Sequence, residues 1–283
     1  MQTIGILGAG TMGGGIAHLA ALCGFDVFLY DLSAEILNEA QQRIISDLLK
    51  GVERQKLTRE QARKAQQRIS LRPALEDFSG CETIIEAVVE RIDVKQDLFK
   101  RLESVCPPTT IFASNTSSFS ITAIATGLKY QDRVAGMHFF NPPLLMKLVE
   151  VVRGRRTSDG TITKTVQLAK SLGKTPVLAK DSPGFIVNRI ARPFYGESLR
   201  ILGEGVSTVE EIDRIVRLEG GFKMGPFELM DLIGIDVNFA VTKSMYEQTF
   251  GEPRYRPHVI QQSMVDAGLL GRKTKRGFYT YEQ

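Results

Sequence analysis

Apolar and polar positions in the first two thirds of the chain predict strands that alternate with helices. Short apolar runs indicate strands at 3–7 and 83–88, and further strands in the stretches TIFASNTSS, RVAGMHFF and MKLVEVVRG. A charged segment, residues 33–68, has a helical pattern, and Ser33 is its expected N-cap. This alternation predicts an α/β fold with a doubly wound parallel sheet, in which ligands bind beyond the carboxyl ends of the strands.

The last third of the chain has a different pattern. From about residue 186 it reads as helices with no clear strand, and Pro183 and Gly184 interrupt the chain just before this change. Pro226 suits the first position of a helix, and Thr208 begins a capping-box pattern. We therefore expect two domains, an α/β domain over residues 1–183 and an all-helical domain over residues 184–283.

The first thirty residues contain a glycine-rich turn between a strand and a helix. Gly8, Gly10 and Gly13 occupy the three positions of a GxGxxG pattern, with Thr11 and Met12 between the last two glycines. In such a turn the first glycine permits a tight bend, the second lets a pyrophosphate approach, and the third lets the helix pack on the strand. The helix N-terminus then presents N–H groups to the phosphates. The sequence therefore predicts a Rossmann-like dinucleotide site made by these five residues.

Asp31 lies at the end of the second predicted strand, about 20 residues after the glycine turn. A carboxylate there accepts hydrogen bonds from the adenosine ribose and repels a 2′-phosphate, so we expect NAD rather than NADP. For His18, in the helix after the turn, we expect a role in packing or at the surface rather than in ligand binding.

Composition narrows the class of protein. The 283 residues carry a net charge of +4, with lysine and arginine scattered rather than clustered, which argues against nucleic acid. Three separated cysteines form no CxxC pair and predict neither a disulfide framework nor a metal site, so we expect a reducing cytoplasm. The N-terminal run reads as a strand rather than a signal peptide, and the sequence lacks an apolar span long enough for a membrane helix.

Two polar residues stand out within apolar runs of the segment MHFFNPPLLMKLVEVV. His138 lies in the first run, and Glu150 follows twelve residues later in the second. A buried polar or charged side chain without a partner is costly, so these two side chains need an explanation. Polar residues also follow other predicted strands, at Glu90 and at 114–118.

Several motifs, in order, resemble the L-3-hydroxyacyl-CoA dehydrogenases, including the short-chain 3-hydroxybutyryl-CoA dehydrogenases. They are GAGTMGGGIA, SNTSS, HFFNP with MKLVEVV, DSPGFIVNR, GFKMGPFELMD and the final GFYTY. The resemblance covers essentially the whole chain. It implies an NAD-binding domain, a helical domain that binds substrate and forms a homodimer, catalysis in the cleft between them, and an acyl-CoA substrate.

The resemblance also assigns roles to individual residues. His138 would be the general acid/base and Glu150 its partner. Ser117 and Asn188 would hydrogen-bond the substrate oxygen and the imidazole, and Asn141 would support the His–Glu pair. Further cofactor contacts would come from Glu90, Lys95, Asn115, Ser117 and Asn141.

The coenzyme A contacts are the least defined part of this expectation. Lys50, Arg54 and Lys56, in the charged helical segment, could meet its phosphates, although a solvated helix face is the simpler interpretation.

General chemistry agrees with the implied roles. Oxidation of a secondary alcohol needs a hydride acceptor and a base, and histidine is the side chain that titrates near neutrality. A carboxylate on the far ring nitrogen fixes the tautomer and stabilises the imidazolium. His138 and Glu150 would thus satisfy one another.

Two departures from the family pattern bear on this interpretation. The chain reads NPPLLMKLVE where the family more often has NPVPVMKLVE, which affects the pocket near Asn141. It also has GRKTKRGFY, with Lys275 where a glycine usually follows the threonine.

Other functions remain open at this point. The stretches ARPFYGESLRILGEG and DLIGIDVNFAVTKSMY resemble the branch that oxidises 3-hydroxyadipyl-CoA, whose second carboxylate would need a cation such as Arg189 or Arg192. A related branch acts on L-gulonate without coenzyme A. A dinucleotide-binding protein that has lost catalysis is the third alternative.

Overall fold

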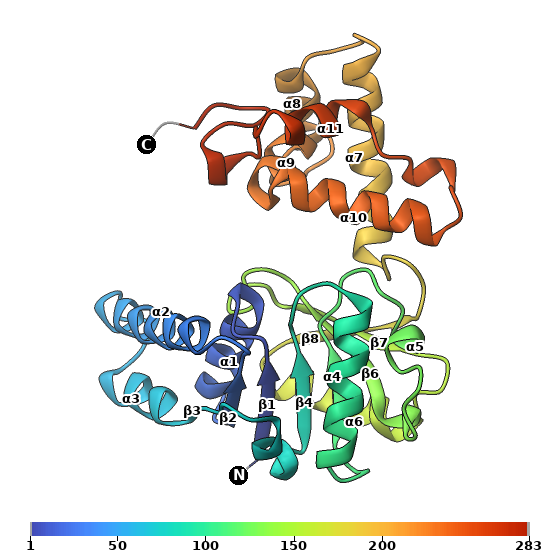
Figure 1. Ribbon diagram of the computed structural model, residues 1–283. Coiled ribbons are helices and arrows are strands. Elements are labelled where there is room, and N and C mark those ends of the chain that lie inside the picture. The colour runs from blue at the N-terminus through green and yellow to red at the C-terminus, as the bar shows by residue number, and fades with distance from the viewer. Residues whose placement is uncertain (1, 282–283) are drawn as a thin grey trace. The chain divides into compact units, whose positions relative to one another are not determined.

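The computed structural model describes residues 2–281 and divides into two compact units, the first ending at Ser182 and the second beginning at Pro183. The first unit is an α/β fold and the second is helical (Figure 1). Among residues 2–281, no helix is long and apolar enough to cross a membrane.

An eight-stranded sheet forms the centre of the first unit. Its order is β3-β2-β1-β4-β5-β6-β7-β8. The strands are β1 (Thr3–Leu7), β2 (Asp26–Tyr30), β3 (Ile69–Leu71), β4 (Thr83–Glu86), β5 (Ile111–Ser114), β6 (Val134–Phe139), β7 (Leu148–Arg153) and β8 (Thr175–Lys180). Strand order reverses direction at β1, as expected for a doubly wound fold.

The sheet is not wholly parallel, which corrects the expectation from the sequence. β6 and β7 pair in antiparallel fashion, whereas the other neighbouring pairs are parallel. Only eight residues, 140–147, connect these two strands. A parallel connection needs a crossover of a dozen or more residues, so this short link forces the antiparallel pairing.

Helices cover both faces of the sheet. One face packs against α1 (Thr11–Leu22) and α6 (Asp159–Ser171), and β6 and β7 contribute Met137, Phe139, Val149 and Val151 to that core. Successive strand residues point to opposite faces. His138 and Glu150 therefore project to the other face, where α4 (Ile92–Val105) and the short α5 (Ile121–Ile124) lie.

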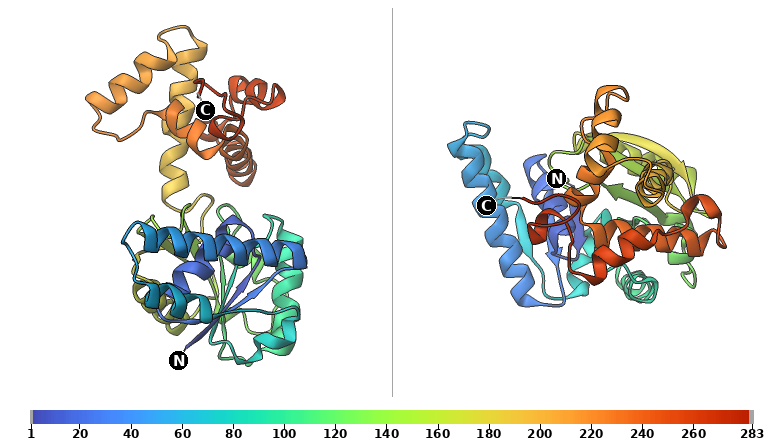
Figure 2. Two further views of the ribbon diagram at one scale, coloured as in Figure 1. Left: turned by 90° about the vertical axis from the view of Figure 1, so that its left-hand side faces the viewer. Right: turned by 90° about the horizontal axis from the view of Figure 1, so that it is seen from above.

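The charged segment forms two helices, α2 (Ala34–Glu53) and α3 (Arg59–Gln67), which lie side by side next to α1 (Figures 1 and 2). The Ser33 hydroxyl accepts from the N–H of Ile36, which confirms the predicted N-cap.

The second unit contains α7 (Val187–Gly203), α8 (Val209–Leu218), α9 (Pro226–Ile233), α10 (Ile235–Gln248) and α11 (Val259–Asp266). Its core is formed by Tyr195, Leu199, Ile212, Phe227, Met230 and Ile235. Pro226 occupies the first turn of α9, as predicted. The Thr208 hydroxyl caps α8 through the N–H of Glu211, whereas the Glu211 carboxylate bonds Arg214.

Two buried aspartates fasten the C-terminal segment to this unit. Asp231 accepts from the N–H groups of Phe278 and Tyr279 and from the hydroxyl of Tyr281. Asp213 caps α9 through the N–H groups of Phe227 and Glu228, at 2.9 Å each, and accepts from the Tyr279 hydroxyl. These bonds explain why the motif GFYTY belongs to the fold of this unit. We call Asp213 and Asp231 the tail clamp.

Candidate active site

The glycine turn has the geometry that its three positions require. Gly8 has φ of +93°, a conformation that glycine adopts at no steric cost. A Cβ on Gly13 would lie 1.8 Å from the carbonyl oxygen of Gly8, so only glycine lets α1 approach β1 here. A Cβ on Gly10, in contrast, would meet no atom within 4 Å. The chain therefore leaves space beside Gly10, where a pyrophosphate would approach.

The N-terminus of α1 is suited to an anion. Gly10 is its N-cap and supplies no side-chain cap, and the first turn, which includes Thr11 and Met12, contains no acidic residue. The N–H groups of a first helical turn lack partners within the helix, and the helix dipole favours negative charge there.

The peptide of Ala9 is held from both sides. Its N–H donates to Asp31 at 2.8 Å, and its carbonyl accepts from the Arg43 guanidinium at 3.0 Å. Asp31 follows β2 directly and also accepts from the N–H of Ser33. Arg43, on α2, was not identified from the sequence, because only the tertiary structure brings this helix to the glycine turn.

His138 and Glu150 lie opposite each other in the register of β6 and β7. His138 Nδ1 is 2.8 Å from Glu150 Oε2, and the two residues are 6% and 0% exposed. The ring of Phe140 packs against the imidazole, with 4.6 Å between ring centroids. Since a charge-assisted hydrogen bond in a buried site is strong, Glu150 fixes the orientation of the histidine ring.

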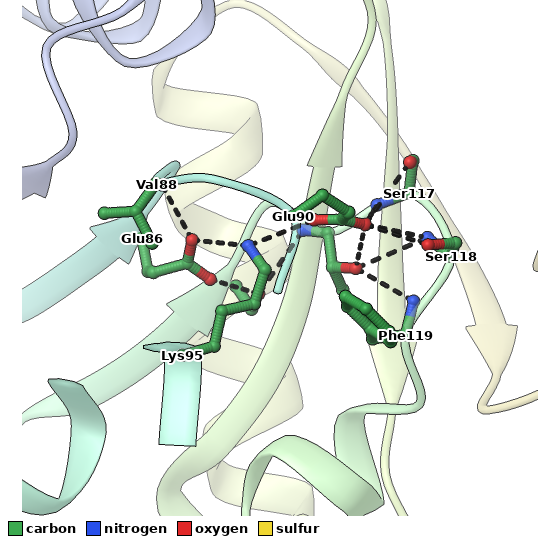
Figure 3. A network of polar contacts seen from close by, with 9 residues as sticks. Glu86, Val88, Glu90, Lys95, Ser117, Ser118 and Phe119 are labelled. Atoms are coloured by element: carbon green, nitrogen blue, oxygen red, sulfur yellow. Dashed lines mark hydrogen bonds and ion pairs between the residues drawn. The ribbon is translucent and has the colours of Figure 1, made fainter. Parts of the chain in front are cut away.

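A cluster of two carboxylates and one ammonium lies at the carboxyl ends of β4 and β5, with Glu86 and Lys95 buried and the Glu90 side chain 37% exposed (Figure 3). Glu86 ends β4 and is fully buried. It accepts from Lys95 Nζ at 2.6 Å, from the N–H of Val88 and from the Ser114 hydroxyl. Lys95 also lies 3.1 Å from Glu90 and is only 1% exposed. We call Glu86, Glu90 and Lys95 the strand-end cluster.

Glu90 organises the polar segment after β5. It accepts from the Thr116 hydroxyl at 2.6 Å, from the N–H of Ser117 at 3.0 Å, and from the N–H and hydroxyl of Ser118 (Figure 3). Burial alone would raise the pKa of Glu90, but the Lys95 ammonium and these donors outweigh it and leave this pKa lowered. Glu90 is therefore a fixed negative charge beside Ser117.

Asn115 connects the same segment to the histidine strand. Its Oδ1 accepts from the N–H of Phe139 at 2.8 Å. The structure thus joins Glu90, Ser117, Asn115 and the residue next to His138 through hydrogen bonds within one unit. Because the first unit already orders these groups by itself, little rearrangement is needed to align them for catalysis.

The remaining predicted residues are placed as follows. Asn141 is exposed two residues after β6, and Asn188 lies half-buried in the first turn of α7 in the helical unit. Lys50, Arg54 and Lys56 lie at or just beyond the far end of α2, about 24 Å along the helix from its start. Lys50 pairs there with Asp47, at 3.6 Å. Contacts of these three bases with coenzyme A stay a prediction.

Two further anchors were missed by sequence reasoning. Lys174 is buried and donates to the carbonyls of Pro143 and Met146, so it holds the segment that contains Asn141. Asp181 accepts from the hydroxyl of Ser120 at 2.7 Å and from the backbone of α5. Asp181 is the first residue of the motif DSPGFIVNR, but its partners, like those of Lys174, lie far away in the sequence, about 60 and 30 residues respectively, so no local pattern indicates these contacts.

A hollow of about 900 Å³ lies at the opposite edge of the sheet, lined by residues such as Thr3, Thr83 and Ile111 at the amino ends of β1, β4 and β5. Ligands of doubly wound sheets bind at the carboxyl ends, where the polar groups described above converge. The candidate site is therefore at the carboxyl edge.

Comparison with known proteins identifies the family of the chain. A sequence model described as 3-hydroxyacyl-CoA dehydrogenase, NAD binding domain, matches residues 3–182, and one described as 3-hydroxyacyl-CoA dehydrogenase, C-terminal domain, matches residues 184–281. The chain belongs to the 3-hydroxyacyl-CoA dehydrogenase family. Its cofactor is NAD, as the glycine turn and Asp31 predicted.

Similar proteins cover nearly all of the chain. A 3-hydroxyadipyl-CoA dehydrogenase of Escherichia coli is 47% identical over 99% of the chain, which spans 59% of that protein. A 3-hydroxybutyryl-CoA dehydrogenase of Clostridioides difficile is 42% identical, over 99% of both proteins. The crystal structure of a (S)-3-hydroxybutyryl-CoA dehydrogenase from Ralstonia eutropha has a TM-score of 0.95 at 41% identity and covers 100% of both chains.

Proposed function

We propose that this protein catalyses the reversible, NAD-dependent oxidation of (S)-3-hydroxyacyl-CoA to 3-oxoacyl-CoA, with short chains such as 3-hydroxybutyryl-CoA as substrates. The observation that carries the proposal is the buried His138–Glu150 pair, next to a segment ordered by Glu90 in an NAD-binding domain. The names of the relatives from Clostridioides and Ralstonia support the substrate class.

The roles of the residues follow from their hydrogen bonds. With Nδ1 of His138 donating to Glu150, Nε2 is the basic nitrogen that takes the proton of the substrate hydroxyl. Glu150 stabilises the imidazolium that results. Ser117, whose N–H is fixed by Glu90, would bind the substrate oxygen, and so would Asn188. A bound NAD would supply the hydride acceptor for the substrate carbon that carries the hydroxyl.

Other parts of the chain would hold the cofactor and the coenzyme. The glycine turn and Asp31 would bind the adenosine half of NAD, and Glu90, Lys95 and Asn115 would lie toward the nicotinamide half. Asn141 would support the histidine pair. Lys50, Arg54 and Lys56 would meet the phosphates of coenzyme A.

A second candidate substrate is 3-hydroxyadipyl-CoA. The relative from Escherichia coli that carries this name is 47% identical to the chain.

We further propose a cytoplasmic homodimer formed through the helical domain of residues 184–283. The support is the set of apolar side chains exposed on that unit, which includes Ile215, Leu218, Phe222 and Val259.

Steady-state oxidation of NADH with acetoacetyl-CoA tests the proposal, with NADPH in a parallel reaction. We expect turnover with NADH and little with NADPH. In His138→Gln, loss of the general base should lower kcat by roughly 10²- to 10⁴-fold. NAD affinity, measured by calorimetry, should stay as in the wild type. Near-normal turnover in this variant would reject the mechanism, and no turnover of any acyl-CoA by the wild type would reject the function.

A further inference from the structure

The strand-end cluster holds more negative than positive charge. Its two carboxylates, Glu86 and Glu90, share the single ammonium of Lys95. In the part of the chain that the structure describes, no other cation pairs with either carboxylate. The neighbouring Arg91 forms an exposed ion pair with Asp93 instead. One negative charge of the cluster is therefore uncompensated.

This excess charge lies mainly at Glu90. Glu86 and Lys95 are 2.6 Å apart with side chains 0% and 1% exposed, so the two charges compensate each other strongly. Lys95 is farther from Glu90, at 3.1 Å, and the Glu90 side chain is 37% exposed. The other partners of Glu90 are neutral hydroxyl and N–H groups of residues 116–118.

The order of the strands relates Glu90 to the dinucleotide. The strands β2, β1, β4 and β5 are successive neighbours in the sheet. Asp31 follows β2, the glycine turn follows β1, and the strand-end cluster lies at the ends of β4 and β5. A dinucleotide lies across such strand ends with its pyrophosphate at the glycine turn. With the adenosine half on the side of Asp31, we expect the nicotinamide half on the side of the cluster.

The two oxidation states of the cofactor differ in charge at the nicotinamide ring. The ring of NAD⁺ is a cation, whereas the ring of NADH is neutral. A fixed negative charge on the nicotinamide side therefore attracts the oxidised ring and has little effect on the reduced one. In a partly buried site, water and salt screen this attraction less than they do in solution.

We propose that the strand-end cluster sets the relative affinity of the protein for the two oxidation states of its cofactor. The uncompensated charge of Glu90 favours NAD⁺ over NADH. Glu86 maintains that charge, because it pairs with the Lys95 ammonium that would otherwise compensate Glu90. Glu86 is thus a positioning residue that acts through Lys95. The inference goes beyond the proposed function and depends on NAD as the cofactor, but not on the identity of the substrate.

The test measures the dissociation constants of NAD⁺ and NADH by calorimetry and compares the ratio Kd(NADH)/Kd(NAD⁺) between variants. Glu90→Gln should lower this ratio roughly 5- to 30-fold, the effect of one charge in a partly exposed site. Glu90→Asp keeps the charge and should keep most of the ratio. Asp97→Asn, at an exposed carboxylate on α4, is the matched control and should leave the ratio as in the wild type.

Variants of the buried pair test the role of Glu86. Glu86→Gln frees Lys95 to compensate Glu90 and should lower the ratio in the same direction as Glu90→Gln. The double variant Glu86→Met/Lys95→Met again leaves Glu90 uncompensated. Its ratio should return to the wild-type value or exceed it, even if both affinities fall. If Glu86 only holds the local structure, the double variant would not recover the ratio.

The outcomes that overturn the proposal concern the ratio and not turnover. A wild-type ratio in folded Glu90→Gln would show that its charge does not discriminate between the oxidation states. A wild-type ratio in Glu86→Gln would reject the role of Glu86. If Glu86→Gln does not fold, the double variant decides, and a lowered ratio there would reject that role. Failure of the dehydrogenase function would instead appear as no turnover of acyl-CoA by the wild type, with the ratios still changed in the variants.

Discussion

The strand-end cluster and the tail clamp each contain two carboxylates, but the carboxylates have different partners in the two regions. Glu86 and Glu90 share the ammonium of Lys95, and they accept from the hydroxyls of Ser114, which ends β5, and of Thr116, respectively. Asp213 and Asp231 accept from backbone N–H groups and tyrosine hydroxyls.

The difference shows in the direction of the pKa shifts. The pKa of Glu90 is lowered, because Lys95 and several donors outweigh its burial. The pKa of Asp213 is raised, because burial outweighs the hydrogen bonds from Phe227, Glu228 and Tyr279. A carboxylate beside a cation keeps its charge, which suits a cofactor site, whereas a carboxylate among peptide dipoles mainly fixes the chain.

The largest expected effect on stability is at Lys95. Lys95→Met leaves Glu86 buried without its cation and should lower the free energy of unfolding by about 3–5 kcal/mol. Adding Glu86→Met should recover much of this loss, since no buried charge of that pair then remains. Urea unfolding at pH 7 measures both, with the exposed Lys64→Met, which loses its ion pair with Glu60, as control. If Lys95→Met lowers the unfolding free energy no more than the control does, Lys95 does not compensate a buried charge on Glu86.

A substitution in the tail clamp should lower the unfolding free energy less than Lys95→Met does, and it should leave NAD affinity unchanged. Asp231→Asn removes acceptors for two N–H groups and one hydroxyl, so we expect a loss of about 1–3 kcal/mol in unfolding free energy. NAD affinity, measured by calorimetry, should not change. Asp236→Asn, which breaks an exposed ion pair with Lys273, is the control and should cost at most about 1 kcal/mol. A marked drop in NAD affinity for Asp231→Asn would remove the distinction between the two regions.

The two regions should respond to acid in opposite directions. Because the pKa of Glu90 is lowered in the folded state, its contribution to stability is present above its ordinary value of 4.5 and is lost as pH falls through the lowered pKa. Because the pKa of Asp213 is raised, its contribution is full below 3.8 and is lost as pH rises through the raised pKa.

Unfolding curves between pH 7 and 3 test these signs. As pH falls, the difference in unfolding free energy between the wild type and Glu90→Gln should shrink. Over the same range, the unfolding free energy of the wild type should rise relative to that of Asp213→Asn. If both differences in unfolding free energy change in the same direction as pH falls, the two environments do not differ in the way described.

The smallest effect is expected at Lys275, in the segment that the tail clamp holds. Lys275 has φ of +58°, in the left-handed region that the family pattern usually gives to glycine. A side chain there costs about 1 kcal/mol or slightly more, so Lys275→Gly should raise stability by about that amount. Lys223→Gly, at an exposed lysine without positive φ, should instead be neutral or destabilising by up to about 1 kcal/mol. A loss of stability in Lys275→Gly would mean that the lysine side chain makes a necessary contact.

Much of the architecture was readable from the sequence, because it depends on local patterns. The run at 3–7 is β1, the Ser33 cap begins α2, and Pro226 begins α9. The glycine turn was equally readable, since its constraints act between residues a few positions apart. Two strands were not identified from the sequence: β3 has only three residues, and β8 is largely exposed and therefore lacks a buried apolar run. The strand expected at 83–88 ends at Glu86.

Tertiary structure alone decided which polar groups meet. The register of β6 and β7 sets His138 opposite Glu150, and the pattern of apolar residues does not specify that register. Glu86 looks like any residue at the end of a strand until Lys95 and Ser114 are brought to it. The sequence does not indicate whether Arg192 is buried, but in the fold it is 4% exposed and, among residues 2–281, makes no ion pair with a carboxylate. Sequence patterns record local conformational preference, whereas the partner of a buried charge depends on contacts between distant segments, which exist only in the folded chain.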